Sequence, residues 1–224
     1  YKGNKNMIKA EYSSHMGGDL TVVNSARVSF AKESQLSLAG MLEDQDSKLI
    51  QYLAKHNHFS PFTHPQITLR ETVPIFVARQ RFKHVVGFTY NEVSRRYVDD
   101  TPEFYQPEEW RQRPDGSVKQ GSGDAHPESL MFKSVYSEFI KNAKATYENM
   151  IACGVAPEQA RMVLPQSMLT SYYVTGSLAA FARLHNLRSD PHAQAEIQEL
   201  AQQIHYILDI LYPISWQALT QGAY

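Results

Sequence analysis

Two long stripes of apolar residues at helical spacing are the strongest constraint on what this chain can fold into. The first stripe ends before Gly154 and the second before Pro213, and both residue types commonly end helices. The stripes are Met131, Val135, Phe139, Ala143, Tyr147 and Met150 or Ile151, and then Ile197, Leu200, Ala201, Ile204, Ile207, Leu208 and Leu211. Because the apolar side of such a helix must be covered, we expect both stripes to be core or subunit-interface surfaces.

Shorter elements precede the two long helices. Asp19 is expected to cap a short helix, and residues 46–56 have helical spacing. Residues 67–73 indicate a strand, and Pro74 suits the first position of a helix that continues over 75–84. The alternate positions of that strand are Ile67, Leu69, Glu71 and Val73. Helices mixed with a few strands predict an α+β domain, with long helices packed on a small sheet.

The length of 224 residues suits one domain, and we expect a single domain over 1–224. Residues 99–127 are rich in Asp, Glu, Pro, Gly and Ser. Unstructured segments of this length are usually functional or mobile surface loops. We interpret 99–127 as a long surface excursion of the domain, because motifs on both sides of it belong to one site, as described below.

Cys153 is the only cysteine, so an intramolecular disulfide and a Cys-rich zinc site are excluded. We expect a buried, inert thiol, because Cys153 lies at the end of an apolar helix. The net charge of −1 favours neither nucleic acid nor a membrane as partner. No apolar run approaches the roughly 20 residues that span a bilayer, and residues 1–9 lack the apolar stretch of a signal peptide. A cytoplasmic location is therefore expected.

The densest chemical signal is a basic cluster within residues 79–97. It combines five cationic residues with one acid, Glu92, and the cations are Arg79, Arg81, Lys83, Arg95 and Arg96. Composition alone favours a solvated basic surface. Interleaved aromatic and amide residues, together with Ser94, also suit an anion, because arginine forms paired hydrogen bonds with phosphate. Both a nucleotide and a strand of nucleic acid would fit.

Three histidines, His56, His58 and His64, lie within nine residues. This spacing raises the possibility of a metal site. No carboxylate or cysteine lies close in sequence to complete one, so packing or ligand-contact roles are favoured. We predict no metal.

Arg188 follows an apolar helical segment and precedes Asp190 and Pro191, which begin the next helix. An arginine at such a junction could bind helix-end carbonyl groups or a ligand. The residues themselves leave both alternatives open.

Taken in order, six motifs of this chain resemble the flavin-dependent thymidylate synthases. They are His-x-Ser-Pro-Phe-x-His at 58–64, Phe-Val-Ala-Arg-Gln at 76–80, Asn-Glu-x-Ser-x-Arg-Tyr at 91–97, Glu-Phe-Tyr at 103–105, Ala-Arg-x-Val-Leu-Pro at 160–165 and Asn-Leu-Arg-x-Asp-x-His-Ala-Gln at 186–194. The ordered set spans most of the chain. The resemblance implies an enzyme that makes dTMP from dUMP with 5,10-methylenetetrahydrofolate, FAD and NADPH. It also implies a homotetramer whose active sites are shared between subunits.

The resemblance assigns residues by matching position. The dUMP site is expected to contain Gln80, Arg81, Lys83, Glu92, Val93, Ser94, Arg95, Arg96, Arg161 and Arg188. The FAD site is expected to contain His58, Ser60, Lys83, His84, Glu92, Ser177 and Arg183, with His58 near the flavin ring and the folate. On this assignment Arg96 and Arg161 supply charge for the phosphate, and Arg188 faces the uracil.

The expected chemistry uses Arg188 and no cysteine. A guanidinium near N3 of the uracil would favour the deprotonated, electron-rich ring, and Ser94 is expected to bind substrate without attacking it. The family signature of Arg-His-Arg, seven residues and Ser is changed here to Lys83-His84-Val85, eight residues and Ser94. The alternatives are a flavin- and nucleotide-binding homologue without synthase activity, a nucleic-acid-binding module and a metal-dependent hydrolase.

Overall fold

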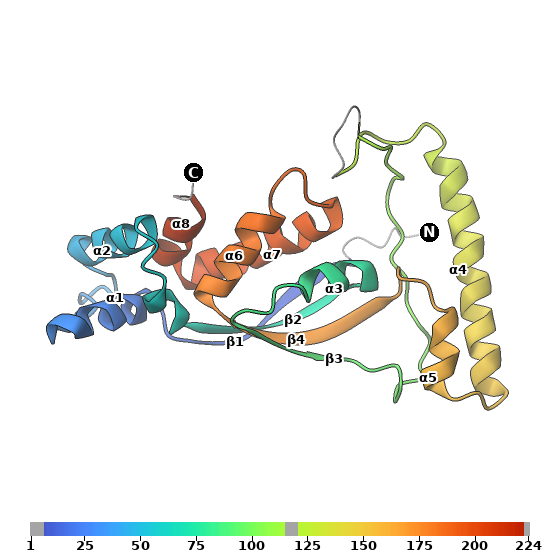
Figure 1. Ribbon diagram of the computed structural model, residues 1–224, viewed down its shortest axis with the longest axis horizontal. Helices are drawn as coiled ribbons and strands as arrows, with labels where there is room; N and C mark the ends of the chain where they lie inside the picture. The colour runs from blue at the N-terminus through green and yellow to red at the C-terminus, as the bar shows by residue number, and fades with distance from the viewer. Residues whose placement is uncertain (1–6, 115–120, 222–224) are drawn as a thin grey trace.

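A four-stranded antiparallel sheet is the centre of the fold, with strand order β1-β2-β4-β3 (Figure 1). The strands are β1 (Lys9–Met16), β2 (Gln66–Pro74), β3 (Phe88–Glu92) and β4 (Leu169–Ser177). The structure is a computed structural model and describes residues 7–114 and 121–221. The α+β prediction is confirmed, as is the strand expected over 67–73.

The two faces of the sheet differ in chemistry. The buried face of β2 carries Ile67, Leu69 and Val73, which belong to the main core. On the other face, hydroxyl groups of β2 and β4 pair across the strands, Thr68 with Thr175 at 2.9 Å and Thr72 with Ser171 at 2.8 Å. Alternation of side chains along a strand produces this division, so only one face of the sheet is packed in the single chain.

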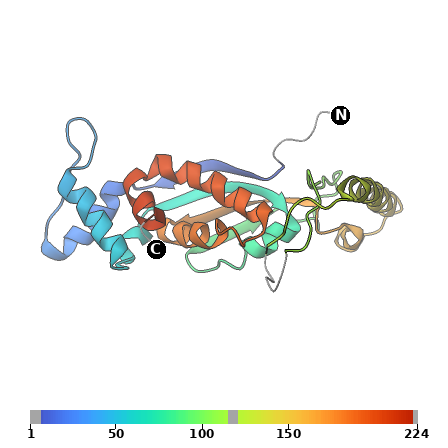
Figure 2. The ribbon, with the colours of Figure 1, turned by 90° about the horizontal axis from the view of Figure 1, so that it is seen from above.

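Helices α6 (Leu178–Arg188) and α7 (Ala195–Leu211) cover the apolar face, and α3 (Ile75–Arg81) continues directly from β2 (Figures 1 and 2). Helices α1 (Asp19–Arg27), α2 (Asp44–Lys55) and α8 (Pro213–Gln221) gather at one end of the molecule. Short 3₁₀ turns occupy η1 (Val28–Phe30), η2 (Ser60–Thr63) and η3 (Arg161–Val163). The second apolar stripe is confirmed as core, because Ile197, Leu200, Ala201, Ile204 and Leu208 are buried.

Helix α4 (Ser129–Ala152) stands at the other end, beside the short α5 (Pro157–Ala160) (Figures 1 and 2). Its C-terminal half packs inward through Ala143 and Tyr147. Its N-terminal half leaves Met131, Val135 and Phe139 exposed by 49%, 61% and 53%. The first apolar stripe is thus only partly covered within this chain, which agrees with the interface role expected for it.

Several local expectations were wrong. Asp19 is the first residue of α1 and does not cap it; its carboxylate accepts the backbone N–H groups of Ile214 and Ser215 at 3.0 Å, and so caps α8. Cys153 is exposed, because it lies just past the end of α4, where Gly154 turns the backbone with a φ of +83°. The helix expected over 75–84 also ends earlier, at Arg81.

Between β3 and α4 the described residues of the 99–127 excursion form no helix and no strand beyond isolated bridges, which pair Phe104 with Met168 and Arg111 with Ala125. Residues 115–120 of the excursion lie outside the described residues. Within the described residues, no helix has the length and apolarity needed to cross a membrane. The cytoplasmic location stays a prediction.

Candidate functional site

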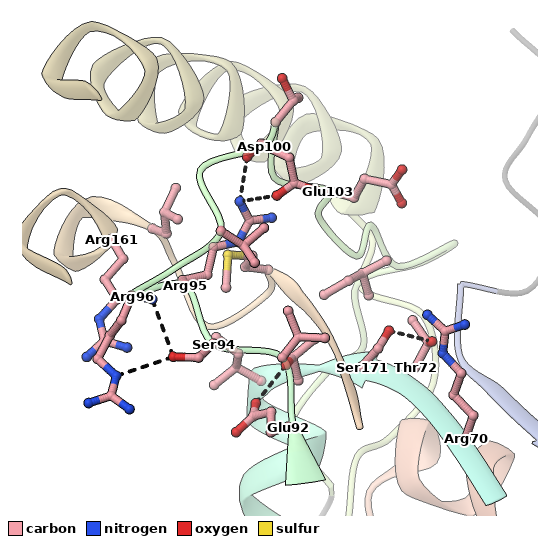
Figure 3. Close-up of a pocket in the computed structure, with 18 residues that line it drawn as sticks. Arg70, Thr72, Glu92, Ser94, Arg95, Arg96, Asp100, Glu103, Arg161 and Ser171 are labelled. Carbon is pink, nitrogen blue, oxygen red and sulfur yellow. Dashed lines mark hydrogen bonds and ion pairs between the residues drawn. The ribbon is translucent and has the colours of Figure 1, made fainter. Parts of the chain in front are cut away.

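A cavity of about 600 Å³ opens where β3 runs into the loop that follows it (Figure 3). The ends of β2 and β4, the residues after β3, and η3 form its walls. Six residues expected at a substrate site line it: Glu92, Val93, Ser94, Arg95, Arg96 and Arg161. The structure therefore brings Arg161 next to a motif more than 60 positions earlier in the chain.

Four arginines line this cavity, and three of them, Arg70, Arg96 and Arg161, form no ion pair with a described residue. In Figure 3, Arg96 and Arg161 occupy one side of the view, and Arg70 of β2 occupies the other. The Nε atom of Arg96 donates to Ser94 Oγ at 3.3 Å, and the Nε atom of Arg161 donates to the carbonyl oxygen of Glu158 at 3.2 Å. Across the described part of the chain, the terminal nitrogens of Arg70, Arg96 and Arg161 make no hydrogen bond and no ion pair. The cavity can thus bind an anion such as a phosphate.

Two other expected residues are already engaged within the chain. Arg95 forms an ion pair with Asp100, with Nη1 and Oδ1 2.7 Å apart. Glu92 accepts a hydrogen bond of 2.6 Å from the hydroxyl of Thr170. Arg95 is therefore less free than Arg96 to meet a ligand.

A second group of expected residues lies outside the cavity. Arg188, at the end of α6, donates from Nε to His84 Nε2 at 3.0 Å, and Gln80 donates to Gln194 at 2.6 Å. Arg188 bonds to a side chain here, and within the described residues it makes no bond to a helix-end carbonyl. Burial, and then the neighbouring charges of Arg188, Arg81 and Arg183, lower the pKa of His84 to about 4. His84 is thus neutral at pH 7, and because Nε2 accepts, its proton must be on Nδ1.

Arg81 was expected to contact dUMP, but the structure places it inside the core. Its side chain is fully buried, and its Nε lies 3.0 Å from Oε2 of the equally buried Glu71. Its Nη1 donates to the hydroxyl of Tyr90 at 2.6 Å, and the guanidinium stacks 4.4 Å from the centre of the Phe88 ring. A guanidinium enclosed in this way has no surface for dUMP in this chain, so we remove Arg81 from the substrate contacts.

Arg183, one of the residues expected to hold FAD, lines a second hollow. A cavity of about 510 Å³ between α2, α6 and α8 is lined by Lys55, Asn57, Phe59, Arg183 and Asn186, among others. Arg183 also donates to the carbonyl oxygen of Val86 at 2.6 Å. Lys55 and Asn57 carry no motif of their own, and only their position next to the histidine motif could have indicated them.

The other residues expected to contact FAD differ in how far they are buried. His58, Ser60 and Lys83 are exposed. Ser177 is buried, and its hydroxyl accepts from the backbone N–H of Ala180 at 3.2 Å, which caps α6. The structure thus gives Ser177 a role in shaping the hollow through the start of α6.

The three histidines of the 56–64 segment are exposed. His56 stacks near Tyr52, with ring centres 4.4 Å apart, and the His56 and His58 rings are 6.4 Å apart. Among residues 7–114 and 121–221, no group of three or more His, Cys, Asp or Glu side chains is placed to hold a metal ion.

The chain is similar to known proteins both in sequence and in three-dimensional structure. A family model described as "Thymidylate synthase complementing protein" matches residues 12–214. The flavin-dependent thymidylate synthase of Thermotoga neapolitana is 38% identical over 209 residues, which cover 93% of this chain and 89% of that protein. The enzyme of the same name from Thermosipho africanus is 37% identical over 211 residues, with 93% and 89% covered. In three dimensions the chain is similar to the UMP/dUMP methylase PolB of Streptomyces cacaoi bound with 5-Br dUMP, with a TM-score of 0.83, 28% identity, and 96% and 95% covered.

Proposed function

Because the chain belongs to the flavin-dependent thymidylate synthase family, we propose that it converts dUMP to dTMP, with 5,10-methylenetetrahydrofolate as carbon donor and NADPH as the source of reducing equivalents. The observation that carries this proposal is the cavity in which Ser94, Arg96 and Arg161 come together. A dianionic phosphate would find charge and hydrogen-bond donors there. The binding of 5-Br dUMP by the structurally similar PolB supports a pyrimidine nucleotide as the ligand.

The proposed site needs a second copy of the chain. Gln80, Lys83 and Arg188 belong to the expected dUMP site, but none of them lines the cavity that contains Arg96 and Arg161. A neighbouring subunit would supply them. The exposed apolar residues of α4 are a suitable contact surface for such a neighbour. We therefore propose a homotetramer with shared sites, as the family resemblance implies.

Arg188 is the residue proposed to activate the uracil. Its Nε is occupied by His84, so its two terminal nitrogens can face a ligand. A permanent positive charge near N3 and the adjacent carbonyl oxygens would stabilise the deprotonated ring, and this effect is strongest where water is excluded. Cys153 is exposed beyond the end of α4, and it does not line either cavity. We propose no cysteine nucleophile.

The residues around the second hollow suit FAD. Arg183 and Lys55 would balance a diphosphate, and the apolar wall formed with Phe59 would accept a flat ring. Lys83 and His84 lie on the loop that follows α3, and His58 and Ser60 lie beside Phe59, so we propose these residues as further contacts. When bound and reduced, FAD supplies the hydride that completes the methyl group.

The test is to measure dTMP by chromatography after incubating purified protein with dUMP, methylenetetrahydrofolate and NADPH, with and without FAD. FAD-dependent dTMP is the expected result. A yellow protein that binds dUMP and yet forms no dTMP would instead identify a flavin- and nucleotide-binding homologue, an alternative favoured only by the altered Lys83-His84-Val85 signature. Absence of flavin, dUMP binding and product together would refute the proposal.

A further inference from the structure

A buried ionic network lies directly beneath the loop that carries His84. Glu71 and Arg81 are both fully buried, and the guanidinium contacts both carboxylate oxygens, at 3.0 to 3.3 Å from Nε and 3.1 Å from Nη2. Tyr172 donates to Glu71 Oε2 at 2.6 Å. Every strong polar group in this cluster has a partner, and such networks hold their members in one arrangement.

Tyr90 connects this network to the loop. Its hydroxyl accepts from Arg81 Nη1 at 2.6 Å, so its own proton is available for a carbonyl oxygen. That carbonyl belongs to His84, 2.6 Å away, and the carbonyl of Arg81 is more distant, at 3.3 Å. Tyr90 therefore fixes the backbone of His84 relative to the buried ion pair.

His84 then contacts the side chain proposed to act on the substrate. Its Nε2 accepts from Arg188 Nε at 3.0 Å. Holding Nε directs the planar guanidinium, because the two terminal nitrogens lie in the same plane as Nε. The orientation of Arg188 thus depends on the position of the His84 ring.

We propose that Glu71, Arg81 and Tyr90 are positioning residues that hold His84, and that His84 holds Arg188 in the orientation required to bind the uracil. This inference rests on the proposed role of Arg188. It assigns Arg81 a structural function in place of the substrate contact expected from its place in the basic cluster.

His84 must be neutral to hold Arg188, and the charged side chains around it disfavour its protonation. Arg188 and Arg183 face His84 from α6, Arg81 faces it from α3, and Tyr90 faces it from β3. A protonated His84 could not accept from Arg188, and it would add a positive charge beside three others. Burial and the cationic surroundings therefore keep the ring in the neutral form that can orient Arg188.

The test compares Tyr90→Phe with Tyr136→Phe. Both changes remove one hydroxyl from a partly buried tyrosine that donates to a backbone carbonyl, which for Tyr136 is that of Tyr105 at 2.8 Å. Tyr136 lies in α4, and no hydrogen bond among the described residues joins it to the network. The full chain, labelled with ¹⁵N-histidine, reports the tautomer of His84 without any ligand, and the His84→Gln variant identifies its signal. We expect the Nδ1–H tautomer in the wild type and in Tyr136→Phe, and a mixture of tautomers in Tyr90→Phe.

The second readout is the ionisation of a bound substrate analogue. Deprotonation of 5-fluoro-dUMP at N3 changes its near-ultraviolet absorbance, so its apparent pKa can be titrated in the complex. We expect Tyr90→Phe and His84→Ala to raise this apparent pKa and to lower kcat by about 10- to 100-fold with a smaller change in KM, since small misplacements of a catalytic group have effects of this size. His84→Gln, whose amide oxygen can accept from Arg188, should recover part of the loss.

The inference is overturned if His84 keeps its tautomer in Tyr90→Phe, or if the analogue ionises equally in the wild type, Tyr90→Phe and His84→Ala. Failure of the wild type to bind the analogue would instead refute the proposed function. In that case the tautomer measurement still decides whether Tyr90 positions His84.

Discussion

Replacement of Gly176 by alanine tests how tightly the sheet packs beneath the proposed site. A Cβ atom at this position would lie 2.3 Å from Cδ1 and 2.5 Å from Cε1 of Phe88, and 3.0 Å from the carbonyl oxygen of Gly87. The Phe88 ring has little room to move, because it packs against Phe181 at 4.9 Å between ring centres and against the guanidinium of Arg81. The substitution must therefore shift Phe88 and the start of β3.

The expected loss follows from two opposing effects. Overpacking of a well-packed core costs about 1–3 kcal/mol. Replacing glycine by alanine also lowers the conformational entropy of the unfolded chain, which stabilises the folded protein by about 0.4–1 kcal/mol. The net loss is then about 1–2 kcal/mol, which for a chain of this length lowers Tm by about 2–8 °C. Thermal and urea unfolding followed by circular dichroism measure both quantities.

Phe88→Leu provides the matched background for this measurement. Leucine has no Cε1 atom, and its Cδ1 methyl group can rotate away from residue 176, so the alanine substitution should cost clearly less in the Phe88→Leu protein than in the wild type. An equal cost in both backgrounds, or no cost in either, would show that the Phe88 ring is not the obstacle and would refute the packing argument.

Three further predictions concern the site, the thiol and pH. Arg188→Ala should lower turnover about 100-fold, and Arg161→Ala should weaken dUMP binding. If the site is shared between subunits, mixing the two variants under conditions that exchange subunits should restore part of the activity. No gain over either variant alone would argue against a shared site. Alkylation of the exposed Cys153, checked by mass spectrometry, should leave dTMP formation unchanged, and inactivation that Cys153→Ser prevents would contradict this. Burial, and then the stacked His205 at 5.0 Å, lower the pKa of His185 below 6.5 in the folded chain. The unfolded chain then binds the proton more readily, so the free energy of unfolding should fall as pH drops below about 6.5. If the urea midpoints of the wild type and His185→Gln vary identically with pH, this assignment is refuted.

The elements with clear periodicity were predictable from the sequence. Residues 46–56, 67–73 and the second apolar stripe pack as their spacing indicates, because each buries one side in the main core. The first stripe was predictable only in part. Its spacing predicts an apolar side, but it does not specify whether the same chain or another copy covers that side, and α4 extends beyond the sheet.

Arg81 shows how a local pattern can mislead. Within a basic cluster it resembles its exposed neighbours, and only a partner distant from the cluster distinguishes it. That partner left a signal in the sequence, because Glu71 occupies an alternate position of the strand together with Leu69 and Val73. A carboxylate on an apolar face requires a buried cation, and Arg81 is that cation.

Arg70 was missed for the opposite reason. It lies on the face of β2 that the apolar residues do not occupy, where polar side chains are ordinary and attract no notice. Only the fold brings it to the cavity that contains Arg96 and Arg161. Its position could not be inferred without knowing which loop passes over that face.

The uncovered half of α4 also has a consequence for newly made chains. Until Met131, Val135 and Phe139 meet another apolar surface, a freshly folded chain presents them to every molecule that it encounters. Productive association and aggregation then compete for the same residues, and both accelerate with concentration. Slow synthesis at low temperature should therefore yield more soluble protein than rapid overproduction.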